Sequence, residues 1–509
     1  MRCIFSLLLS LWTVGCAHRV IQPLMKHRLS PDLPFCDDIP PASGSQLDDL
    51  VTSLAVPSDQ TGVLLLERGA TALIARAWLI QNATERIDAQ YFIFQADNAG
   101  ILATDMLLLA AERGVQVRLL VDDTLPQGDP ELLAALSAHP NAQVRIYNPV
   151  INVGRSTPGK IGAVVTDFRG VNQRMHNKLF IADGRVAITG GRNVGEAYFD
   201  LQQEHNYRDR DVLLVEGAVA SAQVSFDEFW GHTLAQPLEA VLRKPLKYSP
   251  QAIWPVLHQY GCNPENFLPV IRARIAAVPE SLRSRVDVGL YDEVSHTDYI
   301  SDEPGKNDSE TLEGGGITTT ALIGLVREAK ESIVIQTPYL VTTDVGLAVF
   351  GGAVARGVEV RILTNSLAST DNIMAFAGYK KGADALLAAG VELFELKPNM
   401  EGQREIMNGP IVHRYRSDMA LHAKSMVVDG RIAVVGSFNL DPRSANLNTE
   451  SITVMYSDAV AQHLLGRMEN EMKPENAWQR TESYQPEKEA SVWKRFKAAV
   501  ASVVPILLL

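Results

Sequence analysis

The sequence predicts an α/β protein built from two repeated α/β domains that pack face to face and share one active site. Three observations predict this fold. One pattern occurs twice, at positions 176–193 and 422–439, and the same succession of helix-like and strand-like segments precedes each copy. The chain also has 509 residues, more than one ordinary hydrophobic core accommodates. Two such domains facing each other would bring both copies to one central cleft.

The repeated pattern reads HNKLFIADGRVAITGGRN in the first half and HAKSMVVDGRIAVVGSFN in the second. A histidine, a lysine, an aspartate, a glycine and an asparagine recur at one spacing, and glycine or serine follows the shared glycine. The matching positions are His176, Lys178, Asp183, Gly190, Gly191 and Asn193 in the first copy, and His422, Lys424, Asp429, Gly436, Ser437 and Asn439 in the second. Chance hardly produces two copies that agree at every one of these positions.

The repeat extends well upstream of the pattern. A helix-like segment and then a strand with a tyrosine near its end occupy residues 75–94 in the first half and 326–341 in the second. These tyrosines, Tyr91 and Tyr339, precede the pattern histidines of their halves at nearly the same separation. The repeating unit is therefore a whole domain and not a short motif.

A second helix and strand follow in each half, in residues 111–123 and 354–366. Gly114 and Gly357 stand after the helices, where a glycine typically ends a helix. The apolar runs that come next are typical of buried parallel strands.

Residues 303–316, EPGKNDSETLEGGG, are polar, acidic and rich in glycine, so they predict a surface linker between the domains. Residues 236–284 look helical and have no counterpart in the second half; whether they form a lid or cover one lobe is left open. The expected organisation is a signal peptide over 1–16, an N-terminal segment over 17–45, domains over 46–302 and 317–480 on either side of the linker, and a tail over 481–509.

The N-terminus has the layout of a secretory signal. Arg2 precedes a short apolar run, residues 4–14, which ends at small residues. Gly15 and Cys16 resemble a bacterial lipoprotein cleavage site, at which Cys16 would carry the lipid; plain cleavage and an uncleaved anchor stay open. We therefore expect a membrane-associated protein of the cell envelope.

Two further features bear on the envelope. Trp493, Phe496 and the neighbouring basic residues predict a tail that either dips into a membrane interface or docks on the protein's own surface. Cys36 and Cys262 can pair in an exported protein, although two free thiols fit the sequence equally.

The net charge disfavours one class of partner. The chain carries 47 lysines and arginines against 59 aspartates and glutamates, a net charge of −12. Non-specific nucleic-acid binders usually present a basic surface. We therefore expect no nucleic-acid partner.

The repeated pattern has the residue types that phosphodiester chemistry needs. Residues i and i+2 of a strand project to one face, so each half presents an imidazole and an ammonium together. The glycines that follow suit a loop whose backbone approaches a phosphate closely, and the asparagines can donate to its oxygens. Two histidines, two lysines and two asparagines supply a nucleophile, a proton and positive charge without a metal or another cofactor.

Two roles remain open for the aspartates of the pattern. Asp183 and Asp429 each precede a glycine between apolar segments, as at a hairpin turn. They either support that turn or take part in catalysis with the histidines and lysines.

Each histidine also needs a carboxylate that fixes its tautomer and stabilises its charge. Two candidates follow the histidines at similar separations along the chain, Asp209 after His176 and Glu450 after His422. A solvated loop charge is the alternative for each carboxylate. The rivals of Asp209 nearby in the sequence are Asp211 and Glu204.

The paired pattern resembles the signature of the phospholipase D superfamily, and the likeness extends over nearly the whole chain. The resemblance implies that one neutral histidine attacks phosphorus and forms a phosphohistidine, while the other, protonated, releases the alcohol. It assigns the nucleophile to His176 and the acid and base to His422, and it places the supporting acids at Asp209 and Glu450. The near symmetry of the repeat leaves the order of the two histidines open.

Further stretches resemble the bacterial cardiolipin synthase branch of that superfamily, especially its type C group. They are GGRNVGEAYFD (190–200), GSFNLDPRSANLNTE (436–450) and residues 122–149. Many members of the branch begin with two membrane-spanning helices, which this sequence does not show.

This resemblance implies transfer of a phosphatidyl group to phosphatidylglycerol, which yields cardiolipin. The donor is a second phosphatidylglycerol or phosphatidylethanolamine, met at a membrane surface. One chain carries both copies of the pattern, so a monomer suffices for a complete site; the need for an accessory protein is left open. The alternatives are a phospholipase D hydrolase, an exported endonuclease and a non-catalytic envelope scaffold that retains the fold.

Overall fold

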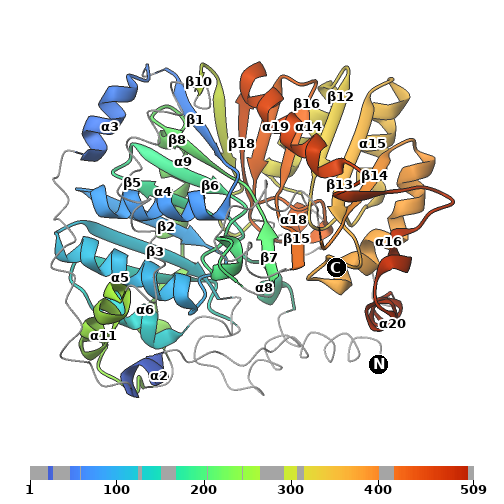
Figure 1. Cartoon of the computed structure of the whole chain (residues 1–509). Coiled ribbons are helices and arrows are strands. Elements are labelled where there is room, and N and C mark those ends of the chain that lie inside the picture. The colour runs from blue at the N-terminus through green and yellow to red at the C-terminus, as the bar shows by residue number, and fades with distance from the viewer. Residues whose placement is uncertain are drawn as a thin grey trace.

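The computed structural model describes residues 21–26, 46–57, 59–123, 129–150, 168–202, 205–242, 245–263, 292–306, 315–399 and 418–502. These residues form two large mixed β-sheets, one in each half of the chain, with helices around them (Figure 1). The predicted fold class is confirmed, because two repeated α/β domains pack against each other.

The strands of the first sheet are β1 (Thr61–Leu66), β2 (Arg86–Tyr91), β3 (Gln116–Asp122), β4 (Ala142–Tyr147), β5 (Leu179–Ala182), β6 (Val186–Gly190), β8 (Asp211–Val215), β9 (Ala235–Pro237) and β10 (Asp292–Val294). Its helices are α4 (Gly69–Asn82), α5 (Asn98–Glu112), α6 (Pro130–Ser137), α9 (Val219–Gly231), α10 (Leu238–Val241) and α11 (Pro250–Cys262). The strand order is β10-β1-β8-β6-β5-β2-β3-β4-β9. Of the paired neighbours, β2, β3 and β4 run parallel, and the others are antiparallel.

The strands of the second sheet are β11 (Thr297–Ser301), β12 (Ser332–Gln336), β13 (Glu359–Asn365), β14 (Glu392–Leu396), β16 (Ser425–Val428), β17 (Ile432–Gly436), β18 (Ser451–Tyr456) and β19 (Ala477–Arg480). Its helices are α14 (Ile317–Glu328), α15 (Asp344–Ala355), α16 (Ile373–Ala388), α18 (Pro442–Asn446), α19 (Asp458–Met472) and α20 (Val492–Ala501). Shorter or peripheral helices are α2 (Ile21–Lys26), α3 (Gln46–Leu54), α8 (Phe168–Asn172), and the 3-10 turns η2 (Glu196–Tyr198) and η3 (Pro486–Glu489).

Seven consecutive strands of one sheet have counterparts in the other. The order β8-β6-β5-β2-β3-β4-β9 in the first half corresponds to β18-β17-β16-β12-β13-β14-β19 in the second, with the same parallel and antiparallel pairings. The hairpin that follows each pattern histidine, β5–β6 or β16–β17, lies inside its sheet and not at an edge. The repeat read from the sequence is thus a repeat of whole sheets.

The predicted helix-ending glycines take the conformation that favours glycine. Gly114 follows α5 with a φ of 99°, and Gly357 follows α15 with a φ of 90°. A residue with a Cβ is strained in this left-handed region. At the other end of the same helices, Asp97 and Thr343 accept a hydrogen bond from a backbone N–H of the first turn. These caps fix where each helix begins and ends.

The pairing of the strands shows that Tyr91 and Tyr339 do not occupy equivalent positions in the two sheets. Gln90 and Gln336 each pair with the residue that directly follows the pattern lysine, so these two glutamines are equivalent. Tyr91 follows Gln90 by one position and Tyr339 follows Gln336 by three, so their expected equivalence is wrong. Tyr91 is buried in the first domain, where its hydroxyl accepts a hydrogen bond from Nε of Arg76 at 3.0 Å.

Three large hydrophobic clusters stabilise the molecule. One lies between the first sheet and α4, α5 and α6, and a second lies between the second sheet and α14, α15 and α16. The third joins side chains from both sheets, such as Leu179 and Val435, with side chains of α9 and α19. Because the third cluster is shared, burial of its apolar surface holds the two domains together.

The chain passes from the first sheet to the second between β10 and β11. β10 pairs with β1 at the edge of the first sheet, and β11 pairs with β18 at the edge of the second. The crossing therefore precedes residue 297, ahead of the linker expected over 303–316. The predicted domain boundaries stay a prediction. β11 belongs to the second sheet, although the prediction placed its residues in the first domain, 46–302.

The region without a counterpart in the second half contains α10 and α11 in its described part. α11 packs against α5 and α6, so this part covers outer helices of the first domain. Cys262, at the end of α11, is disulfide-bonded, and the other three cysteines of the chain lie outside the described residues.

Several predicted features fall on residues that the structure does not describe. They are the signal peptide, Cys16, Cys36, Glu204 and residues 307–314 of the linker. Where the chain is described, it contains no helix with the length and apolar character needed to cross a membrane.

Candidate active site

A short two-stranded sheet joins the two halves beside the repeated pattern. β7 (His205–Arg208) of the first half pairs in parallel with β15 (Asp418–Leu421) of the second, near the centre of Figure 1. The N–H of His422, directly after β15, donates to the carbonyl of Arg208 at 2.7 Å. Asp209 comes directly after β7, so this backbone pairing sets Asp209 beside His422.

A single backbone bridge repeats this arrangement with the halves exchanged. Met175 pairs with Thr449, and the N–H of His176 donates to the carbonyl of Thr449 at 2.9 Å. Glu450 follows Thr449, so it lies beside His176.

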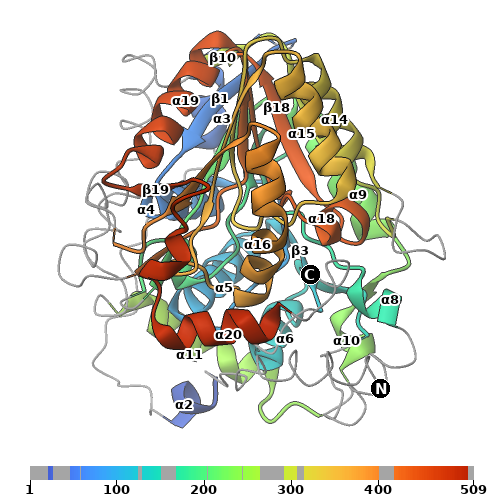
Figure 2. The same cartoon turned by 90° about the vertical axis from the view of Figure 1, so that its right-hand side faces the viewer.

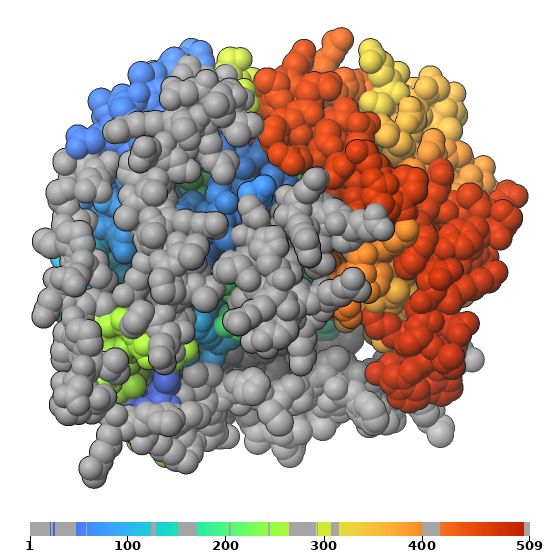
Figure 3. Space-filling model, viewed as in Figure 1, coloured from blue at the N-terminus to red at the C-terminus, as the bar shows by residue number. Residues whose placement is uncertain are grey.

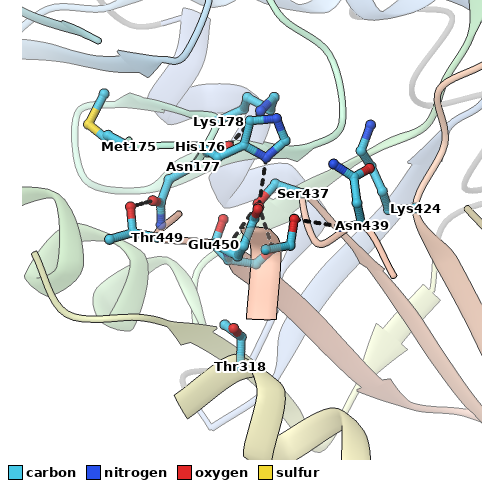
Figure 4. Close-up of polar contacts among 12 residues, drawn as sticks. Met175, His176, Asn177, Lys178, Thr318, Lys424, Ser437, Asn439, Thr449 and Glu450 are labelled. Atoms are coloured by element: carbon cyan, nitrogen blue, oxygen red, sulfur yellow. Dashed lines mark hydrogen bonds and ion pairs between the residues drawn. The ribbon is translucent and has the colours of Figure 1, made fainter. Parts of the chain in front are cut away.

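Each pattern histidine is consequently hydrogen-bonded to a carboxylate of the other half. Nδ1 of His176 lies 2.8 Å from Oε2 of Glu450, as Figure 4 shows, and Nδ1 of His422 lies 2.6 Å from Oδ2 of Asp209. All four side chains are buried. The sequence predicted both carboxylates, but their positions along the chain suggested that each one supports the histidine of its own half. In the structure each one binds the histidine of the other half.

The hydrogen bond at Nδ1 of each histidine determines the protonation of the other ring nitrogen, Nε2. A carboxylate that accepts from Nδ1–H fixes the neutral tautomer whose Nε2 carries a lone pair. Burial lowers the pKa of His176 to about 4; the Glu450 carboxylate opposes this effect, and the Lys178 ammonium adds to it. Burial and the nearby Lys424 also lower the pKa of His422. Both rings are therefore mainly neutral at pH 7, the form in which imidazole is a nucleophile.

The two carboxylates remain ionised although they are fully buried. Burial alone raises the pKa of Glu450 and of Asp209, but the adjoining histidine and the pattern lysines outweigh burial, and both pKa values lie below their usual range. Each histidine therefore has a fixed negative charge beside it, which stabilises the ring when the ring becomes positive.

The pattern lysines are buried beside the histidines. Nζ of Lys178 donates to the carbonyl of His176 at 2.5 Å, and Nζ of Lys424 lies 2.9 Å and 3.2 Å from the ring nitrogens of His422. Burial lowers the pKa of Lys178 to about 7 and the pKa of Lys424 to about 8. A phosphodiester bound beside them would favour the ammonium form and raise both pKa values again.

The residue that follows the shared glycine of the pattern lies beside a supporting carboxylate in each half. Gly191 leaves space for Asp209, and Ser437 binds Glu450. Ser437 donates from Oγ to Oε2 of Glu450 at 2.5 Å. At Gly191, a Cβ would collide with Oδ1 of Asp209, so a side chain there would displace this carboxylate. The sequence suggested that the backbone at these glycines approaches a phosphate closely. At Gly191, the group that approaches the backbone is the supporting carboxylate of Asp209.

The pattern asparagines are buried near the same groups. Oδ1 of Asn193 accepts a hydrogen bond from the N–H of Ile93 at 2.9 Å, and its amide nitrogen has no hydrogen-bond partner among the described residues. In Asn439 the side-chain oxygen has no partner in the described part of the chain, and amide oxygen and nitrogen can exchange places. Since buried amides are normally paired, a phosphate oxygen is a fitting partner for these groups.

The pattern aspartates lie at hairpin turns and bind neighbouring backbone. Asp183, with a φ of 51°, accepts hydrogen bonds from the N–H groups of residues 84–86 at 2.8 and 2.9 Å. Asp429, with a φ of 52°, binds residues 330–332 in the same way. The four residues of β5 or β16 lie between each turn and the histidine end of the strand, roughly 13 Å of extended chain. These contacts favour the turn-supporting role.

Asp211, the described rival of Asp209, takes part in a different contact. Its Oδ2 forms an ion pair with Arg76 at 2.9 Å inside the first domain. Within the described residues, no three His, Cys, Asp or Glu side chains are grouped so as to hold a metal ion.

A buried ion network lies behind the site and joins the halves. Nε of Arg208 donates to Glu471 at 2.8 Å, and Nε of Arg210 donates to Glu67 at 2.7 Å. Arg208 also forms an ion pair with Glu67, so Glu67 links the two arginines. Because these arginines flank Asp209 in the chain, the network fixes the segment that carries it.

Known proteins share the repeated domain. A family model described as "Cardiolipin synthase, PLD-like domain" matches residues 77–230 and 322–472, once in each half. The chain belongs to this phospholipase D-like family. Both crossed histidine–carboxylate contacts lie within the two matched stretches.

Relatives of the chain extend over most of its length. Cardiolipin synthase C of Escherichia coli strain K12 is 34% identical over 465 residues, which cover 88% of this chain and 96% of the relative. A cardiolipin synthase of Oceanobacillus iheyensis is 26% identical and covers 89% of this chain and 77% of its own. The crystal structure of phosphatidylserine synthase from Haemophilus influenzae Rd KW20 matches 88% of this chain and 95% of its own, with a TM-score of 0.57 and 15% identity. That last likeness shows a common fold.

Sequence reasoning missed the aromatic side chains of this phospholipase D-like site. The ring of Phe92 lies edge-on to His176, with 4.7 Å between ring centroids. The rings of Tyr198 and Tyr207 lie 5.3 Å and 5.1 Å from the ring of His422. These rings displace water from the imidazoles and so contribute to the lowered pKa values. No shared spacing in the two halves marks them.

Asp371 extends this aromatic cluster to the surface. Its carboxylate accepts hydrogen bonds from the hydroxyls of Tyr207 at 3.3 Å and Tyr339 at 3.0 Å. Asp371 itself is exposed. The path from His422 through Tyr207 therefore reaches the protein surface at Asp371.

Proposed function

We propose that this chain synthesises cardiolipin by transferring a phosphatidyl group to phosphatidylglycerol through a phosphohistidine intermediate. The chain is a phosphatidyltransferase of the phospholipase D type, since both halves belong to the cardiolipin synthase family and cardiolipin synthase C is related over nearly its whole length. The observation that carries the finer proposal is the pair of crossed histidine–carboxylate contacts, which supplies two oriented imidazoles in one buried site.

In the first step, Nε2 of His176 attacks the phosphorus of the donor lipid, and the bond from phosphorus to the headgroup oxygen breaks. His422, protonated at Nε2, gives its proton to that oxygen, so the headgroup leaves as an alcohol. The phosphatidyl group is then held by a P–N bond to His176. Asp209 stabilises the imidazolium of His422 before the transfer, and Glu450 stabilises the positive ring of the intermediate.

In the second step, neutral His422 accepts the proton of a phosphatidylglycerol hydroxyl. The oxygen of that hydroxyl attacks phosphorus while the P–N bond breaks, which releases cardiolipin and restores His176. Lys178, Lys424 and Asn193 donate to the non-bridging oxygens in both steps. This chemistry uses side chains alone, so EDTA should leave the rate unchanged; a strong loss that zinc reverses would contradict it.

The order of the histidines follows the resemblance to the family, because the site is nearly symmetric. The neutral ring of His176 suits a nucleophile, whereas His422 needs the charge of a bound phosphodiester to favour its protonated form. Trapping the phosphoenzyme tests this order. His176→Ala should form no phosphoenzyme, and His422→Ala should form it slowly and fail to complete the cycle; the opposite result would exchange the two roles.

Transfer requires that the acceptor hydroxyl reach the phosphohistidine before water does. The side chains of Glu450 and Asp209 are fully buried, and His176 and His422 are each 6% exposed. A site with so little access for water supports transfer over hydrolysis. The released alcohol names the donor, since phosphatidylglycerol releases glycerol and phosphatidylethanolamine releases ethanolamine.

We place the protein in the cell envelope, where these lipids lie. The signal-like N-terminus and Cys16 support this proposal. Labelling of the protein with a fatty acid, which Cys16→Ser should abolish, tests the lipid anchor.

A further inference from the structure

Helix α20 presents an apolar face at the protein surface. Val492, Trp493, Phe496 and Val500 have exposed fractions of 73%, 61%, 57% and 43%. The rings of Trp493 and Phe496 stack with 5.6 Å between their centroids. Single exposed apolar side chains are ordinary, but four of them on one helix of 10 residues form a patch that marks an interaction surface.

The helix is amphipathic in a particular way. Successive residues of an α-helix are rotated by about 100°, and on this scale the four apolar side chains lie within an arc of about 100°. Ala498 and Ala501 are buried on the opposite face, where the helix packs against α16 (Figure 2). Arg495 and Lys497 border the apolar arc, one on each side. The helix therefore docks on the protein through its alanines and turns its apolar arc away from it.

We propose that α20 is the membrane-docking element of this protein and that its apolar arc inserts into the interface of an anionic lipid bilayer. A helix of this kind lies in the plane of the interface, with its rings at the boundary of headgroups and acyl chains and its cations at the phosphates. α20 carries three cations, Lys494, Arg495 and Lys497, and no acidic residue, in a chain of net charge −12. Its charge is thus complementary to an anionic surface. The inference rests on the proposed lipid substrates.

The position of α20 connects the bilayer to the candidate active site. Nζ of Lys494 donates to the carbonyl of Ala368 at 2.6 Å, and Ala368 shortly precedes Asp371 in the chain. Asp371 binds Tyr207, whose ring packs on His422. In Figure 1, α20 lies at the lower right and β7 and β15 lie near the centre, and Figure 3 shows the red atoms of α20 on the surface at the lower right. A bilayer bound by α20 would meet the face at which the aromatic cluster of His422 reaches the surface.

The double variant Trp493→Glu, Phe496→Glu tests this surface. Both side chains are exposed, so the core is unchanged. The full chain is compared with and without the double substitution, in a Cys16→Ser background so that no lipid anchor contributes. We expect at least about tenfold weaker binding to vesicles of phosphatidylglycerol and phosphatidylethanolamine. We also expect slower turnover on these vesicles and unchanged turnover of a short-chain phosphatidylglycerol that is dispersed as monomers.

The matched control is Val224→Glu, Val345→Glu. These residues are 60% and 61% exposed and lie on α9 and α15, so the control adds the same charge at apolar surface positions elsewhere. It should bind vesicles as the unsubstituted chain does.

Trp493→Phe gives a local measurement of insertion. Lipids with brominated acyl chains quench tryptophan fluorescence at close range, and the difference between the unsubstituted chain and this variant isolates Trp493. We expect quenching of Trp493 in vesicles with phosphatidylglycerol and little in vesicles of phosphatidylcholine alone.

Two results would overturn the proposal. They are vesicle binding by the double variant that equals that of the unsubstituted chain, and absence of quenching at Trp493. A double variant that binds vesicles normally but no longer self-associates would assign the face to a second copy of the chain instead. Binding and quenching need no turnover, so a chain that docks through α20 but makes no cardiolipin would refute only the proposed reaction.

Discussion

At the residue scale, the chemistry depends on which nitrogen of each imidazole is free. Glu450 and Asp209 bind Nδ1 of His176 and His422, so Nε2 of His176 is left for a substrate, while Nε2 of His422 lies 3.2 Å from Nζ of Lys424. Each carboxylate belongs to the half opposite its histidine. A substitution of a carboxylate in one half should therefore act on the histidine of the other half.

Glu450→Gln removes the charge beside His176 and keeps the shape of the side chain. An amide does not hold the ring in one tautomer or stabilise its positive form, so kcat should fall by about 10²–10⁴-fold. KM should change little, since Glu450 is buried behind the ring. Steady-state kinetics and the rate of phosphoenzyme formation measure this, with the exposed Glu469→Gln as the control. A Glu450→Gln enzyme with the kcat of the unsubstituted chain would mean that the contact is only structural.

The lowered pKa of His176 makes the stability of the fold depend on pH. The folded protein holds this pKa at about 4, below the value of 6.5 for an unperturbed histidine, because the ring is buried. Between these values the unfolded chain binds a proton that the folded chain does not. The contribution is therefore complete above pH 6.5 and is lost as the pH falls towards 4.

Urea unfolding at pH 7 and pH 5 measures this contribution. The free energy of unfolding of the unsubstituted chain should fall between these pH values by more than that of His176→Gln, whose side chain does not titrate. Equal losses in the two proteins would contradict the lowered pKa.

At the element scale, short segments carry the contacts on which the site depends. β7 and β15 pair across the halves, the hairpins β5–β6 and β16–β17 end in turns that bind neighbouring backbone, and an ion network lies behind Asp209. The turns and the network differ in their distance from the histidines, so substitutions in them should have different effects.

Asp183→Ala and Asp429→Ala separate the two roles that the sequence left open. Each aspartate accepts backbone N–H groups much as a helix cap does, so its loss should lower the free energy of unfolding by about 1–2 kcal/mol. The kcat of the folded variants should stay within a few-fold of the unsubstituted value. Chemical denaturation and kinetics measure both quantities. A loss of kcat of more than about 100-fold in a stable variant would place the aspartate in the chemistry.

Glu471→Gln should weaken the junction between the halves. It removes one of the two ion pairs of the buried Arg208, whose pair with Glu67 remains, and the loss of a buried partner costs up to about 3–5 kcal/mol of unfolding free energy. Glu469→Gln is the matched control on the same helix, because Glu469 pairs with the partly exposed Arg361 and should cost less than about 1 kcal/mol. Equal costs for the two variants, measured by denaturation, would show that the network does not hold the halves together.

At the scale of the whole molecule, the sequence contained most of the fold. The repeated pattern, the buried strand runs and the glycines at 114 and 357 predicted two similar α/β domains, because these features depend on local chain geometry. The register of the strands was harder to predict from the sequence. Tyr91 and Tyr339 appeared equivalent because a tyrosine ends each apolar run, and only the pairing of the strands shows that their positions differ. The crossing between sheets at β10 and β11 was missed because both strands are short.

The pattern residues and the two carboxylates of the candidate site could be named from the sequence, but the contacts between them could not. All of the pattern residues, Asp209 and Glu450 were named from sequence. Their crossed pairing depends on β7 meeting β15 and on the Met175–Thr449 bridge, which are contacts between segments far apart in the chain. Phe92, Tyr198 and Tyr207 lie beside the histidines only because the fold brings their segments there.

The most direct test of cardiolipin synthesis through His176 compares the products that the unsubstituted chain and His176→Ala form from labelled phosphatidylglycerol vesicles, with and without phosphatidylethanolamine. We expect cardiolipin from the unsubstituted chain and none from His176→Ala, whose fold should stay intact. Phosphatidic acid alone would mean that water outcompetes the lipid acceptor and that the enzyme is a hydrolase. Cardiolipin from His176→Ala at the unsubstituted rate would contradict the assigned nucleophile.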